Sequence, residues 1–149
     1  MRLRHRVRTT ASPAQVWQVL GDPVRWPEFD PFLRRVSGAH GPAAAGQHLL
    51  GHSRGLGVPI PVDVLEALPE RRLALRVHVL PGVVEEVTHD VTPTLRGGSD
   101  LVVSVVVEGL FARVAFGPIW LARGLTSRVL GVRAGGLARA ARRAAEGAA

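Results

Sequence analysis

Two ionisable side chains share the predicted inner face of a strand over residues 83–91. Glu85 and His89 fall on the same side of this segment as Val87. The residues that alternate with them are polar throughout: Glu86, Thr88, Asp90 and Thr92. Because successive side chains of a strand point to opposite faces, the wholly polar set belongs in solvent. We therefore expect Glu85, Val87 and His89 to point into the interior.

A third ionisable residue, Glu66, follows the same alternation on a strand predicted between residue 60 and Pro69. It falls in step with Ile60, Val62, Val64 and Leu68. Glu66 and His89 would both neighbour Leu75 on the intervening strand, two strand spacings or about 10 Å apart. Glu85 and His89 are about 13 Å apart along their own strand, which is too far for a direct pair.

A histidine oriented by a carboxylate can act as a general acid and base. Glu66 and His89 are therefore the candidate catalytic residues. The alternative is structural: Glu85 lies in solvent at the open end of its strand, and His89 is a core histidine with its hydrogen bonds satisfied. The sequence leaves both interpretations open.

Other chemistries find less support. His48 and His52 have the spacing of a helical zinc motif, but four glycines surround them, so the segment is not a helix and the two rings are too far apart on a strand. The chain has no cysteine and no Gly-x-Ser-x-Gly or Gly-x-Gly-x-x-Gly motif. We expect no metal site, no nucleophile and no cofactor.

The charge and composition narrow the choice of partners and location. The 149-residue chain has a net charge of +7, and all 19 of its basic residues are arginine. These are scattered without interleaved aromatics, so we expect solvated faces rather than a nucleic-acid interface. The chain has no apolar leader and no run of 18 apolar residues, so we predict a cytoplasmic protein without a transmembrane span. We expect it to be a monomer or a homodimer.

Aromatic side chains gather in two places that could face each other across the mouth of a cavity. One group follows the first strand and the other flanks the start of the last helix: Trp17, Trp26, Phe29 and Phe32, then Phe111, Phe116 and Trp120. They could gate an apolar ligand or simply pack the hinge of the helix. With Glu85 and Val87, we expect Phe111, Trp120 and Leu125 to contact the ligand.

The elements that position these residues can be predicted in order. A strand ends at Thr10, Ser12 caps a helix that begins at Pro13, and a second short helix ends near Trp26. Six strands follow, with a loop over residues 55–59. A turn and loop over residues 109–118 lead to a long helix from Pro118. Its predicted apolar stripe is Leu121, Leu125, Val129 and Val132, and Gly135-Gly136 interrupts it.

Residues 9–36, with their strand, capped helix and second short helix, resemble the opening of the START/Bet v 1-like (SRPBCC) superfamily. The resemblance is to the small bacterial polyketide cyclase/dehydrase-like proteins. It implies a single α+β helix-grip domain over residues 1–149, with about seven antiparallel strands curved around a cavity under the last helix.

The resemblance also implies two functions. One is binding of a small, largely apolar molecule, lipid- or polyketide-like. The alternative is polyketide cyclase or dehydratase chemistry by polar residues inside the same cavity. Family members often use tyrosine, serine and arginine there, and this chain has no tyrosine.

Overall fold

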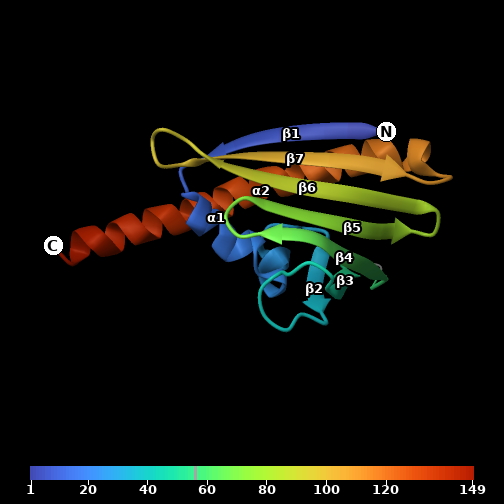
Figure 1. The fold of residues 1–149 in the computed structure, drawn as a ribbon, viewed down its shortest axis with the longest axis horizontal. Coiled ribbons are helices and arrows are strands. Elements are labelled where there is room, and N and C mark those ends of the chain that lie inside the picture. The colour runs from blue at the N-terminus through green and yellow to red at the C-terminus, as the bar shows by residue number, and fades with distance from the viewer. Residues whose placement is uncertain (56) are drawn as a thin grey trace.

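A curved antiparallel sheet and a long helix across its inner face make up most of the molecule (Figure 1). The computed structural model describes residues 1–55 and 57–149, within which seven strands form one sheet in the order β1-β7-β6-β5-β4-β3-β2. The elements are β1 (Arg2–Thr9), α1 (Pro13–Leu20), η1 (Pro23–Glu28), β2 (Leu33–Ser37), β3 (His48–Ser53), β4 (Pro59–Leu68), β5 (Arg72–Leu80), β6 (Val83–Pro93), β7 (Ser99–Glu108) and α2 (Ala112–Gly147). The predicted helix-grip arrangement is confirmed. Of the loop predicted over residues 55–59, Leu56 lies outside the described residues.

The two short helices after β1 begin and end where the sequence indicates. The Ser12 hydroxyl accepts from the Gln15 N–H at 3.3 Å, and the Gln15 side chain accepts from the Ser12 N–H at 2.9 Å. This reciprocal pair satisfies two donors at the start of α1. The Trp26 indole N–H then donates to the Leu20 carbonyl at 2.8 Å. Trp26 of η1 thereby pairs a carbonyl at the end of α1 and fixes the two helices against each other.

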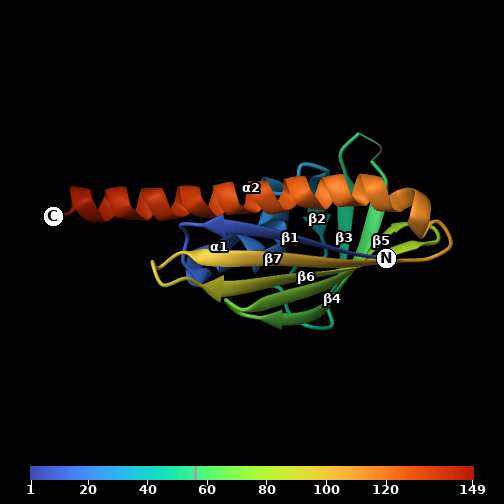
Figure 2. The same cartoon turned by 90° about the horizontal axis from the view of Figure 1, so that it is seen from above.

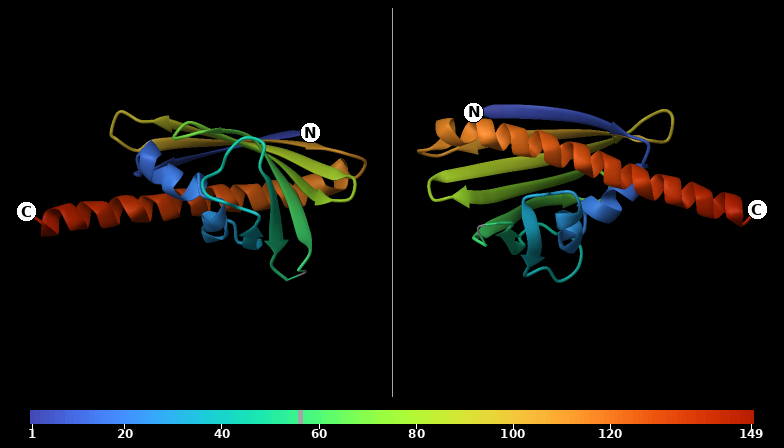
Figure 3. Two further views of the ribbon diagram at one scale, coloured as in Figure 1. Left: turned by 60° about the horizontal axis from the view of Figure 1, so that its bottom comes forward. Right: turned by 180° about the vertical axis from the view of Figure 1, so that it is seen from behind.

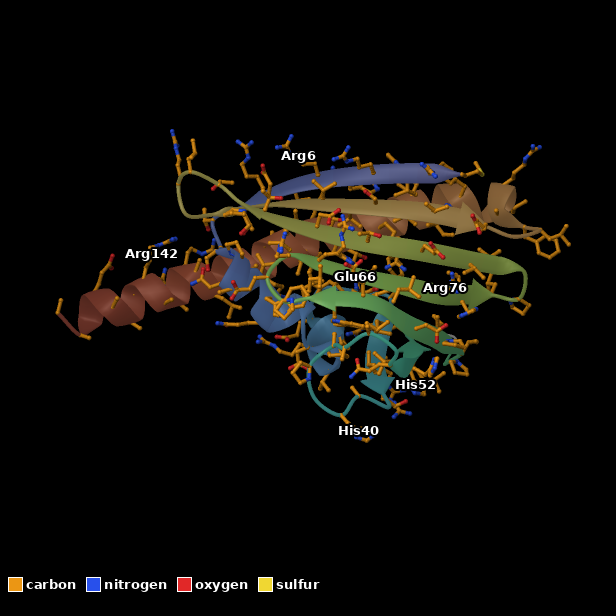
Figure 4. The ribbon with its side chains drawn as sticks, viewed as in Figure 1. Arg6, His40, His52, Glu66, Arg76 and Arg142 are labelled. Atoms are coloured by element: carbon orange, nitrogen blue, oxygen red, sulfur yellow. The ribbon has the colours of Figure 1, made fainter. Side chains whose placement is uncertain are left out.

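A shift of register in β4 overturns one expectation about the interior. Val64 pairs with Leu75, but Glu66 pairs with Ala74, because an extra residue is inserted between them. An inserted residue moves every later side chain to the other face of the sheet. Glu66 consequently lies on the outer face, with its side chain 43% exposed and 4.0 Å from Arg72 (Figure 4). The prediction that Glu66 points inward is wrong.

The helix α2 begins earlier and faces differently than the sequence suggested. It starts at Ala112, so Pro118 lies inside it and most of the loop predicted over residues 109–118 is helical. It also runs without interruption through the two glycines at 135 and 136. The predicted apolar stripe faces the sheet only in part: Val129 packs against the core, but Leu121 is 65% exposed and Val132 is 67% exposed. The buried face consists mostly of small residues and a few larger ones: Ala112, Ile119, Thr126, Ser127, Leu130, Gly131, Ala134, Gly135 and Ala138.

Those small residues let α2 lie close to β1. A Cβ atom at Gly131 would lie 2.7 Å from Val7 Cγ1, and one at Gly124 would lie 3.0 Å from the His5 ring. The Thr9 hydroxyl donates to the Gly131 carbonyl at 3.0 Å, which ties the helix to the end of β1. Figure 2 and Figure 3 show that α2 crosses the sheet along this edge and that its C-terminal turns extend past it. Within the described part of the chain, no helix is long and apolar enough to cross a membrane.

Candidate functional site

A cavity of about 850 Å³ lies between the inner face of the sheet, η1 and the first half of α2. Most of its wall is apolar, supplied by side chains that include Leu20, Trp26, Phe29, Ile60, Val62, Leu73, Leu75, Val77 and Ile119. Phe32, Trp120 and Leu125 also line the cavity and are 46–52% exposed. Because these three side chains face both the cavity and solvent, they mark its mouth.

Some of the residues predicted to bind a ligand line the cavity, and others do not. Glu85, His89, Trp120 and Leu125 line the cavity. Val87 points inward as expected, but it is 1% exposed and packs in the core without lining the cavity. Phe111, immediately before α2, is 55% exposed and does not line the cavity either.

A cluster of three charged side chains occupies one wall of the cavity. Arg123 of α2 donates from Nε to Glu85 Oε2 at 2.8 Å and from Nη2 to Glu85 Oε1 at 3.3 Å. Its Nη1 lies 3.7 Å from Asp30 Oδ2. Burial acts to lower the pKa of Arg123, but the charge and hydrogen bonds of Glu85, followed by the charge of Asp30, raise it overall. Glu85 is 3% exposed, so the expectation of a solvent-exposed Glu85 at the strand end is wrong.

His89 is held neutral by its surroundings. It is 6% exposed. Burial lowers the pKa of His89 to about 4, and the positive charge of Arg123 adds to this, against smaller opposing effects of the Leu73 backbone and Asp90. Among the residues that the structure describes, its Nδ1 has no hydrogen-bond partner. The alternative of a fully satisfied core histidine therefore does not fit, because a buried polar atom without a partner is costly.

A second histidine in the cavity was not anticipated. His5 of β1 pairs with Val103 of β7, and Val103 pairs with His89 of β6, so the two imidazoles share one row across the inner face. Nε2 of His5 is buried and likewise lacks a partner in the described part of the chain. The His5 and Trp120 rings lie 5.7 Å apart. In the sequence, His5 alternates with arginines that point to solvent, and this alternation could have identified it as an inward-facing residue.

Arg123 and Asp30 were also missed, although a signal existed. Arg123 is an ionisable residue within a mostly apolar stretch of the last helix, between Leu121 and Leu125. A buried glutamate such as Glu85 requires a cationic partner or a hydrogen-bonding one. The sheet was predicted to pack against this helix, so a search for that partner would have led to Arg123.

His48 and His52, which have the spacing of a helical zinc motif, contact different partners. His48 Nδ1 lies 2.6 Å from Asp63 Oδ1, and the same carboxylate also reaches His78 at 3.1 Å. His52 Nε2 lies 3.0 Å from the Ser37 hydroxyl. Considering only residues 1–55 and 57–149, no group of three or more His, Cys, Asp or Glu side chains could hold a metal ion.

The family model described as "Polyketide cyclase / dehydrase and lipid transport" matches residues 1–145. The chain belongs to this family. Its fold is similar to that of MLL2253 from Mesorhizobium loti, with 20% identity, a TM-score of 0.73, and coverage of 89% of this chain and 96% of that one. Ara h 8.0201, at 12% identity and a TM-score of 0.69 over 89% and 97% of the two chains, has the same fold.

A further solved structure has a similar fold. DynU16, a putative protein in the dynemicin biosynthetic locus, shares 19% identity at a TM-score of 0.67. The match covers 87% of this chain and 45% of DynU16. No curated protein matches the chain. The family model establishes the family, and the solved structures establish the Bet v 1-like fold.

The low pKa of His89 predicts a pH-dependent stability. An unfolded histidine takes up a proton near pH 6.5, whereas folded His89 resists protonation until about pH 4. Stability should therefore be complete above pH 6.5 and fall as the pH decreases, by about 2 kcal/mol between pH 7 and pH 5. Urea unfolding at both pH values measures this. The His89→Leu variant is the control and should lose that part of the difference; an unchanged difference would contradict the assignment to His89.

Proposed function

We propose that the protein binds a small, largely apolar molecule, lipid- or polyketide-like, in the cavity under α2. The observation that carries this proposal is the cavity of about 850 Å³ with a predominantly apolar wall and a mouth at Phe32, Trp120 and Leu125. Ligand sites of proteins typically have volumes of about 300–1,000 Å³ and few polar groups. Membership of a family named for polyketide cyclases, dehydrases and lipid transport supports the same proposal.

The enzymatic alternative loses the pair on which it depended. Glu66 lies on the outer face beside Arg72, while His89 lines the cavity on the inner face. The sheet separates the two side chains, so Glu66 cannot orient His89 for proton transfer. We therefore propose binding rather than acid–base catalysis by this pair. A cytoplasmic location and the absence of a nucleic-acid partner stay predictions from the sequence.

Filling the cavity should abolish uptake of an apolar probe. We expect the wild-type protein to bind Nile red, an uncharged dye that fluoresces in apolar surroundings, with micromolar affinity. Val62 lines the cavity from β4, so Val62→Trp should place an indole in the ligand space and weaken binding at least about tenfold. Fluorescence titration measures both affinities.

A matched control lies on the same strand. Leu65 is 41% exposed and outside the described lining residues, so Leu65→Trp should leave the dye affinity unchanged. Far-UV circular dichroism checks that both variants keep the fold. Failure of the wild-type protein to bind the dye, or equal binding by the Val62→Trp variant, would contradict the proposal.

A further inference from the structure

The face of α2 that points away from the sheet carries a row of exposed apolar side chains. Val114, Leu121, Leu125 and Val132 follow one another at intervals of seven, four and seven residues, which places them on one side of a helix. They are 46–81% exposed. Figure 2 shows that α2 lies on the outside of the molecule. Because a protein surface rarely gathers so many apolar side chains without a partner, this outer row indicates an interaction surface.

The same face of α2 becomes basic toward its C-terminal end. Arg139 and Arg143 continue the outer row, seven and eleven residues after Val132. This end of the helix extends past the sheet, as the position of Arg142 in Figure 4 shows. Between Glu108 and Glu146 the sequence contains no acidic residue. Considering only what the structure describes, no carboxylate lies within 4.0 Å of five arginines of α2: Arg113, Arg128, Arg139, Arg142 and Arg143.

The outer row adjoins the mouth of the cavity. Leu121 and Leu125 belong to the row and also line the cavity, and Arg128 on the same side of the helix lines it as well. Phe32 and Trp120 add two half-exposed aromatic rings at this mouth. A partner that covers the outer row therefore also lies against the mouth of the cavity.

The charge of the helix decides which partner fits the outer row. A second copy of this chain would bring two arginine-rich helices together, and like charges at close range repel. A nucleic acid would attract the arginines, but its phosphate backbone provides no apolar region for valine and leucine. An anionic lipid bilayer meets both requirements, because its headgroups attract arginine and its acyl boundary accepts apolar side chains.

We infer that α2 docks the protein onto the surface of an anionic lipid bilayer. The outer row from Val114 to Val132 enters the boundary between headgroups and acyl chains, and Arg139 and Arg143 contact the headgroups. The helix lies along the surface, since no helix in the described part of the chain is long and apolar enough to cross a membrane. In this orientation the mouth of the cavity opens toward the lipid. The docking surface does not depend on which molecule the cavity binds.

Cosedimentation with vesicles of two compositions tests the docking. One set consists of phosphatidylcholine alone, and the other of equal amounts of phosphatidylcholine and phosphatidylglycerol. We expect binding to the anionic vesicles to be at least about hundredfold tighter, the contribution of about three arginines at an anionic surface. Added salt should weaken this binding because it screens the attraction. Absence of binding to the anionic vesicles, or equal binding to both sets, would overturn the inference.

A double variant tests the apolar part of the surface without changing the charge. Val114→Gln/Val132→Gln should weaken binding to anionic vesicles at least about tenfold, because two side chains no longer enter the apolar boundary. Neither valine lines the cavity, so the Nile red affinity, measured without vesicles, should stay unchanged. The control Leu68→Gln/Leu95→Gln removes two exposed leucines that lie outside α2 and should not affect vesicle binding. Equal vesicle binding by the valine variant and the control would overturn the inference.

A second double variant tests the basic part. Arg139→Gln/Arg143→Gln should weaken binding to anionic vesicles about thirtyfold, as expected for the loss of two arginines at the surface. Arg2→Gln/Arg4→Gln removes the same net charge from exposed positions of β1 and should weaken binding far less. Equal losses in the two variants would show that net charge alone attracts the protein, and would overturn the placement of α2 at the bilayer.

The outcomes also distinguish other partners and the proposed function. Sedimentation equilibrium without lipid detects self-association, and a wild-type dimer that Val114→Gln/Val132→Gln dissociates would overturn the inference in favour of a second copy. Vesicle binding without Nile red uptake would support the docking surface and contradict the proposed function. Nile red uptake without vesicle binding would do the reverse. The wild-type comparison of the two vesicle compositions decides the question even if a variant does not fold.

Discussion

Arg123→Met should lower the free energy of unfolding by about 3–5 kcal/mol, the cost typical of breaking a buried ion pair by removing one partner. Glu85 is 3% exposed and receives both of its side-chain hydrogen bonds in the described structure from Arg123. Without the guanidinium, its carboxylate would remain buried with an uncompensated charge. Urea denaturation followed by far-UV circular dichroism measures the loss.

A second substitution distinguishes lost charge pairing from lost packing. In the Arg123→Met/Glu85→Leu double variant the buried acid is gone, and most of the stability should return because an apolar pair of similar volume needs no ionic partner. Asp30 keeps the Phe32 N–H as a partner in this variant. If the double variant were as unstable as Arg123→Met alone, unpaired Glu85 would not be the cause.

The second large effect is expected at Trp26. Trp26→Ala should cost about 3–5 kcal/mol, because it deletes a large buried side chain and leaves a cavity. Trp26 is 5% exposed, and its indole N–H holds the Leu20 carbonyl at 2.8 Å. The loss would separate the two short helices that close one side of the ligand cavity. Thermal or urea unfolding quantifies it.

Two comparisons divide the Trp26 effect into packing and hydrogen bonding. Trp26→Phe keeps an aromatic ring in the same place and should cost less, about 1–3 kcal/mol, mainly because the Leu20 carbonyl loses its partner. Trp120→Ala removes the same side chain from a position that is 48% exposed, and its stability cost should be small. A loss below about 1 kcal/mol in Trp26→Ala would contradict the role of Trp26 described above.

Alternation along strands predicted the interior well wherever the register was regular. Glu85 and His89 lie inside, as their position among valines indicated, because β6 pairs without a break with β7. Glu66 was misplaced because a single inserted residue in β4 reverses the alternation, and no glycine or proline marks that insertion. Register depends on pairing with the neighbouring strand, which the sequence of one strand does not contain.

The last helix could be located from the sequence, but its orientation could not. Of the four residues expected to cover the sheet, Val129 packs against the core, whereas Leu121, Leu125 and Val132 are largely exposed. Glycines, alanines and hydroxyl residues occupy most of the buried face. Close contact with β1 excludes large side chains from that face, so hydrophobicity along the helix misleads there. Arg123 was missed because its partner, Glu85, is distant in the sequence.

Gly124 and Gly131, the two glycines that bring α2 against β1, leave parts of the helix that can diversify to different degrees. At Gly131 a side chain would meet Val7, so the buried face of the helix around this residue has little freedom to accept new residues. The half that carries Trp120, Leu121 and Leu125 borders open space, where larger or smaller side chains can be accommodated. A relative could therefore change the size of the molecule it accepts by substitutions at these cavity-lining positions alone, with the attachment of the helix at Gly124 and Gly131 preserved.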